Sequence, residues 1–109
     1  GNSLQKKRPF DLQVLLQNTK YGEAQNVTVS IDIPDNVMLI DGEEYTNIGN
    51  LDGGKTKSLV YSLIANNNYS GTSIPVTVHI KEKYGKYAED KTINLAFNQS
   101  FASNKISVD

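Results

Sequence analysis

His79 is the only side chain in the sequence whose ordinary pKa lies near neutral pH, so it is the first candidate for acid–base chemistry. A catalytic histidine needs a nucleophile and an orienting acid within hydrogen-bonding distance. His79 alternates with the apolar Val78 and Ile80 and is therefore expected on the outer face of a strand, beside Thr77 and Lys81. Since the sequence places neither partner next to it, an ordinary exposed strand histidine is the preferred interpretation, and no catalytic residue is assigned.

Acidic side chains gather in the turns and could supply oxygen ligands to calcium. They are Asp32, Asp35, Asp41, Glu43, Glu44, Asp52, Glu82, Glu89 and Asp90. The spacing of an EF-hand loop is not met anywhere, and a solvated turn is the preferred interpretation of the best candidate, residues 41–44. With no cysteine and one histidine, a thiol nucleophile and a Cys/His zinc site are excluded. The sequence therefore predicts no metal and no cofactor.

Tyrosines in turns are candidates for ligand or partner contact. Tyr84 and Tyr87 flank Gly85 in one loop, and Tyr69 lies in another. An exposed tyrosine can stack on a sugar or anchor a protein interface. The alternative is that such tyrosines cap the ends of the fold. The absence of tryptophan, a larger stacking platform, weakens the carbohydrate interpretation.

Composition excludes further classes of partner. The 109 residues include 11 Lys and Arg against 12 Asp and Glu, a formal net charge of -1, which leaves no basic excess for nucleic acid. The longest aliphatic run, residues 37–40, is far shorter than the roughly 20 residues that span a bilayer. Neither nucleic-acid binding nor direct membrane insertion is expected.

Apolar residues recur at every second position, so β-strands must position all of these side chains. This period of two predicts strands at 10–17, 27–33, 58–65, 76–81 and 93–97, with weaker ones at 37–40 and 45–48. Gly-, Asn- and Pro-containing turns separate them, and no apolar stripe with helical spacing is present. The pattern predicts an all-β, immunoglobulin-like antiparallel β-sandwich of about seven strands.

The ends of the sequence differ from this pattern. Residues 1–8, with Gly1 and the basic Lys6-Lys7-Arg8, are interpreted as a tag remnant and linker, and residues 9–99 as the sandwich. The polar residues 100–109 are expected to form a tail or a linker to a next domain. We therefore expect a piece of a longer protein.

Two turn motifs carry a family resemblance. Residues 17–27, QNTKYGEAQNV, resemble the "N-x-G-x-A-x-N-V" hairpin of CARDB-like and NPCBM-associated immunoglobulin-like domains of bacteria. Residues 48–55, IGNLDGGK, running into Leu59-Val60-Tyr61, resemble the "i-G-x-L-x-x-G" turn of the same group. The resemblance covers about residues 10–98. Physically, Asn18 and Gly22 are able to adopt left-handed conformations, and Gly53-Gly54 allows a hairpin to reverse without a Cβ clash.

The resemblance implies a non-catalytic accessory or spacer module of a larger bacterial protein, in an extracellular, periplasmic or cell-surface location. Its partners would be neighbouring domains, and similar domains also accompany caspase-like peptidases. An alternative is an adhesion module that binds carbohydrate or protein through Tyr84, Tyr87 and Tyr69. Dimerisation through an edge strand is a further open possibility. An enzyme would require a polar pocket around His79 or paired acids.

Overall fold

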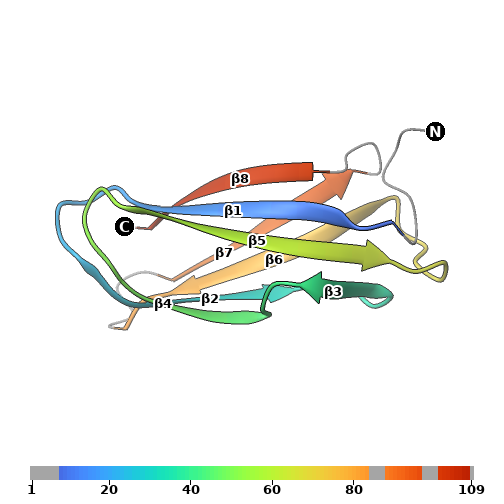
Figure 1. Ribbon diagram of the computed structural model, residues 1–109, viewed down its shortest axis with the longest axis horizontal. Coiled ribbons are helices and arrows are strands. Elements are labelled where there is room, and N and C mark those ends of the chain that lie inside the picture. The colour runs from blue at the N-terminus through green and yellow to red at the C-terminus, as the bar shows by residue number, and fades with distance from the viewer. Residues whose placement is uncertain (1–7, 84–87, 97–100, 109) are drawn as a thin grey trace.

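The computed structural model describes residues 8–83, 88–96 and 101–108. They form eight strands (Figure 1): β1 Phe10–Asn18, β2 Ala24–Asp32, β3 Val37–Asp41, β4 Tyr45–Leu51, β5 Thr56–Ala65, β6 Ser73–Lys81, β7 Ala88–Ala96 and β8 Phe101–Val108. Within these ranges, no helix is long and apolar enough to cross a membrane.

The strands form two four-stranded sheets, with the orders β3-β5-β1-β8 and β4-β2-β6-β7. The sheets pack face to face (Figure 1), which confirms the predicted all-β, immunoglobulin-like sandwich. The structure has eight strands in place of about seven. One pairing also departs from the antiparallel prediction, because β8 runs parallel to β1.

β8 is the strand that the sequence did not predict, and it replaces most of the tail expected at 100–109. It pairs with β1 from Asp11↔Phe101 to Asn18↔Val108. A strand can join a sheet edge through its backbone donors and acceptors, whatever its side chains. In β8, buried Ile106 adds a core contact, but the sequence shows too little apolar alternation to reveal a strand.

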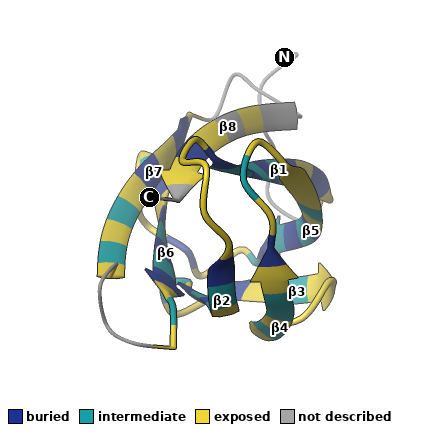
Figure 2. Cartoon of the chain, turned by 90° about the vertical axis from the view of Figure 1, so that its left-hand side faces the viewer, coloured by how far each residue is buried: buried dark blue, intermediate teal, exposed yellow. Residues whose placement is uncertain are grey.

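The core lies between the sheets and follows the predicted alternation, which Figure 2 shows as bands of buried and exposed residues along the strands. Leu12, Val14 and Leu16 of β1 have no exposed surface. Val, Ile and Leu side chains from the facing sheet and the ring of Tyr61 complete the packing. The Tyr61 hydroxyl is buried with no hydrogen-bond partner among the described residues, and burial raises its pKa to about 12.

Most connections cross from one sheet to the other. The strand orders place β1, β3 and β5 in one sheet and β2, β4 and β6 in the other, so β6 and β7 are the only consecutive strands that share a sheet among those described. The expected hairpins at 17–27 and 48–55 are therefore arches between sheets. Gly and Asn permit a tight reversal in either case, so local turn chemistry could not distinguish a hairpin from an arch.

The two arches meet, and so do the two motifs that carry the family resemblance. Asn18 is only 1% exposed, and its Nδ2 donates to the carbonyl oxygens of Gly22 (2.8 Å) and Leu51 (2.9 Å). Its Oδ1 accepts from the Lys20 N–H (3.0 Å), and its carbonyl accepts from the Gly54 N–H (2.7 Å). We call this cluster, Asn18, Gly22, Leu51, Gly53 and Gly54, the arch junction.

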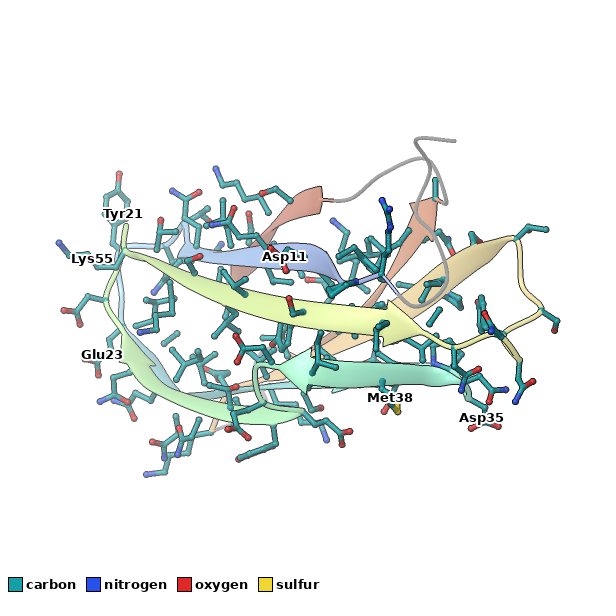
Figure 3. All side chains as sticks on the ribbon, turned by 45° about the vertical axis from the view of Figure 1, so that its right-hand side comes forward. Asp11, Tyr21, Glu23, Asp35, Met38 and Lys55 are labelled. Carbon is teal, nitrogen blue, oxygen red and sulfur yellow. The ribbon has the colours of Figure 1, made fainter. Side chains whose placement is uncertain are left out.

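In the first motif, positive φ occurs at Asn26 and not at Asn18 or Gly22, whereas in the second motif it occurs at Gly49 and Gly54. Asn18 is needed for its amide hydrogen bonds, not for its φ. Figure 3 shows Tyr21 of one arch and Lys55 of the other at the same end of the sandwich, with Asp35 at the opposite end.

Candidate functional site

The candidate site lies on the outer face of the β4-β2-β6-β7 sheet and is set by strand register. Ser30 of β2 pairs with Tyr45 on one side and His79 on the other, and His79 pairs with Asp90 of β7. Paired residues on neighbouring strands point to the same side of the sheet. The register therefore aligns Tyr45, Ser30, His79 and Asp90 in one row across four strands.

His79 is held between two carboxylates. Its Nε2 lies 2.6 Å from Asp32 Oδ2, and its Nδ1 lies 2.6 Å from Asp90 Oδ1. The side chain of His79 is 27% exposed, whereas both aspartates are well exposed. The outward orientation that alternation predicted is thus observed, but the residue is not the isolated, exposed histidine that the sequence suggested.

The sequence contained a partial signal for one of these acids. Asp90 is expected in a turn, and the antiparallel register of β6 and β7 makes it face His79. Alternation places Asp32 on the outer face of its strand. Its approach to His79, 47 positions away in the chain, depends on which strands are neighbours, and no local pattern contains that information.

The two carboxylates favour the protonated ring. Two hydrogen bonds raise the pKa of His79 above its ordinary value, and the bond to Asp90 contributes more than the bond to Asp32. An imidazolium has an N–H to donate to each aspartate, whereas a neutral imidazole would turn one lone pair toward a carboxylate oxygen. His79 therefore joins β2, β6 and β7 by charge-assisted hydrogen bonds.

This arrangement limits the chemistry of His79. Both ring nitrogens are already engaged, so neither is free to accept a proton from a nucleophile or to ligate a metal. In the part of the chain that the structure describes, no group of three or more His, Cys, Asp or Glu is placed to hold a metal ion. In the acidic turn at 41–44, the Asp41 carboxylate accepts from the N–H of Gly42.

A hollow of ≈ 420 Å³ surrounds the Asp32–His79–Asp90 cluster. Its other lining residues are Thr28, Ser30, Tyr45 and Lys81. Tyr45 is 62% exposed and supplies an aromatic ring to this otherwise polar surface. The hollow can therefore offer hydrogen-bonding groups and a ring face to a ligand, a combination that the sequence-based candidates did not include.

The tyrosines predicted as contacts lie elsewhere. Tyr84 and Tyr87 fall outside the described residues. Tyr69 is 7% exposed and its hydroxyl donates to the Ser73 carbonyl, so its ring belongs to the core and not to a contact surface. This position corresponds to the alternative role, capping an end of the sandwich.

We expect the stability of the fold to depend on pH through His79. Because its folded-state pKa is raised, the contribution is fully present below the ordinary histidine pKa of about 6.5 and is lost as pH rises through the higher folded-state value. The measurement is urea unfolding of the wild-type chain and His79→Gln from pH 6 to 9. The difference in free energy of unfolding between the wild-type chain and His79→Gln should shrink as pH rises. A difference that stays constant would contradict a stabilising role for protonated His79.

The fold and site define an all-β sandwich with a polar hollow on one open face. Neither protein-family models nor curated proteins give a match to the sequence. Among solved structures, the chain is similar to a FixG-related protein from Vibrio parahaemolyticus, with a TM-score of 0.48 and 12% sequence identity. That similarity covers 76% of this chain and 72% of the other.

Proposed function

We propose that this chain is a non-catalytic immunoglobulin-like module that spaces and joins its neighbours in a longer protein through contacts between domains. The observation that carries the proposal is the parallel pairing of β1 with β8. Two parallel strands both begin at one end of the sandwich and both finish at the other. The chain therefore enters the sandwich at Phe10 and leaves it at Val108, beside the far end of β1 (Figure 1). The extents of 46 × 22 × 19 Å give such a module a long axis.

Two further observations support the proposal. Both nitrogens of the single histidine are engaged by carboxylates, which favours a structural role over a catalytic one. The motifs that resemble CARDB-like and NPCBM-associated domains meet in the arch junction, a structural feature without reactive groups. By that resemblance, the parent protein would be bacterial and exported, at the cell surface or in the periplasm, and a caspase-like peptidase is one candidate neighbour.

The test is deletion of residues 9–108 from the parent protein. A spacer predicts that the maximum dimension measured by small-angle X-ray scattering falls by about the 46 Å length of the module. The neighbouring domains should keep their own thermal transitions and any activity they have. A chain that keeps its maximum dimension, or neighbours that stay folded but lose activity entirely, would overturn the proposal.

The hollow beside Tyr45 favours a second candidate, an adhesion module that binds glycan or protein. An exposed ring next to carboxylate, hydroxyl and ammonium groups is suited to a sugar, whose rings stack and whose hydroxyls hydrogen-bond. A glycan array and a protein pull-down would compare the wild-type chain with Tyr45→Ala and with the Tyr84→Ala, Tyr87→Ala double variant. Loss of a bound ligand in only one variant would locate the site, and absence of any ligand would reject this candidate.

A further inference from the structure

We propose that the module bears tension between its neighbours and that the parallel β1–β8 ladder is the element that resists it. This inference rests on the proposed spacer function, because only a module connected in series carries force along its length. The same topology that separates the entry and exit points also sets the direction in which that force acts.

The direction of force follows from the register. β1 and β8 are paired from Asp11↔Phe101 to Asn18↔Val108, and both run the same way along the sandwich (Figure 1). Tension enters at the start of β1 and leaves at the end of β8, so it pulls the paired strands past one another. The hydrogen bonds of a parallel ladder are evenly spaced, and a sliding force loads them together instead of one after another. A ladder loaded in this way resists rupture better than one that is opened from its end.

β1 is anchored firmly enough to transmit this load. It is a central strand, paired on its other side with β5 from Phe10↔Leu63 to Gln17↔Thr56. Its inward side chains are fully buried, and Asn18 ties its far end to the arch junction.

β8 is the element that is expected to yield. Among the described strands it lies at the sheet edge with β1 as its one neighbour in the sheet. Buried Ile106 and a hydrogen bond from Ser103 Oγ to Gln13 Oε1 (3.2 Å) supplement its backbone pairing. Separation of β8 from β1 should therefore be the first event when the chain is stretched, and it should govern the unfolding force.

The absence of cysteine in the chain permits a direct test by single-molecule force spectroscopy. In the first variant, handles are attached at Arg8→Cys and at a cysteine added after Asp109, which loads the ladder by sliding. In the second, the handles are attached at Lys20→Cys and at the same added cysteine. Lys20 is exposed and follows Asn18, which pairs with Val108, so this geometry pulls β8 away from β1 at the end where the two handles meet.

At equal pulling speed, the first geometry should require an unfolding force more than about twofold higher than the second, because its ladder bonds are loaded together. Equal urea midpoints for the two variants would show that the difference does not come from stability. Equal forces, or a higher force in the second geometry, would overturn the load-bearing role. That result would leave the spacer proposal intact, since the scattering experiment on the parent protein tests it separately.

Discussion

Substituting Gly53 by alanine is expected to lower the free energy of unfolding by about 2–4 kcal/mol. A Cβ at this position would lie 2.5 Å from the carbonyl oxygens of both Lys20 and Tyr21. These are backbone atoms of the facing arch, so no side chain can rotate to relieve the contact. One arch would have to move, and the hydrogen bonds of the arch junction would be strained.

The matched control for this prediction is Gly22→Ala, on the opposite arch of the same junction. A Cβ at Gly22 meets no atom within 4 Å, and its φ is not positive. Urea unfolding should therefore show a change within about 0.5 kcal/mol for the control. Equal losses of stability in both variants would mean that close packing of the arches is not the reason for glycine at position 53.

Asn18→Asp is expected to destabilise the fold by about 3 kcal/mol at pH 7. The substitution preserves shape but removes both Nδ2 hydrogens, and it places a buried carboxylate against the carbonyl oxygens of Gly22 and Leu51. Repulsion and burial disfavour the charged form, so the folded-state pKa of the introduced group should be raised. Stability should then be regained as pH falls and the group becomes protonated.

Asn47→Asp provides the control for charge alone. Asn47 is exposed, and its Oδ1 accepts from the N–H of Gly49 (2.9 Å), a bond that aspartate can keep. Its unfolding free energy should change by less than about 0.5 kcal/mol. If Asn18→Asp is no less stable than this control, or if its deficit does not diminish toward pH 4, then the amide hydrogen bonds do not hold the arches together.

These two predictions concern the same end of the molecule at which β8 leaves the sheet. Asn18 pairs with Val108, so the arch junction lies beside the exit of the chain. A weakened junction would loosen the far end of β1, the strand through which we propose that tension passes. The family-like motifs would then serve the mechanical continuity of the module.

The strands were predictable because their signal is local. In β1 and β6, alternating apolar residues identify both the element and its buried face, since successive side chains point to opposite sides of a strand. The outward direction of His79 follows from the same rule. β8 was missed because it is held largely by backbone hydrogen bonds to β1, and such bonds leave little trace in the choice of side chains.

The candidate site was only half predictable. Alternation places His79 and Asp32 on outer faces one at a time, but it does not reveal that β2 and β7 both flank β6. Tyr69 illustrates the same limit, because its polar loop sequence leaves a contact role and a capping role open, and only the structure shows that its ring packs into the core. A loop sequence shows that the chain turns, but not whether the rest of the fold covers it.

The sequence by itself therefore determined an all-β sandwich with a Val-, Ile- and Leu-rich core and without cysteine chemistry, because these properties depend on composition and short-range periodicity. Only the tertiary structure decided that the turns are arches, that two carboxylates hold His79, and that β8 runs parallel to β1. Each of these depends on which strands become neighbours. That choice is made by packing and backbone pairing between segments far apart in the chain, and no short stretch of sequence encodes it.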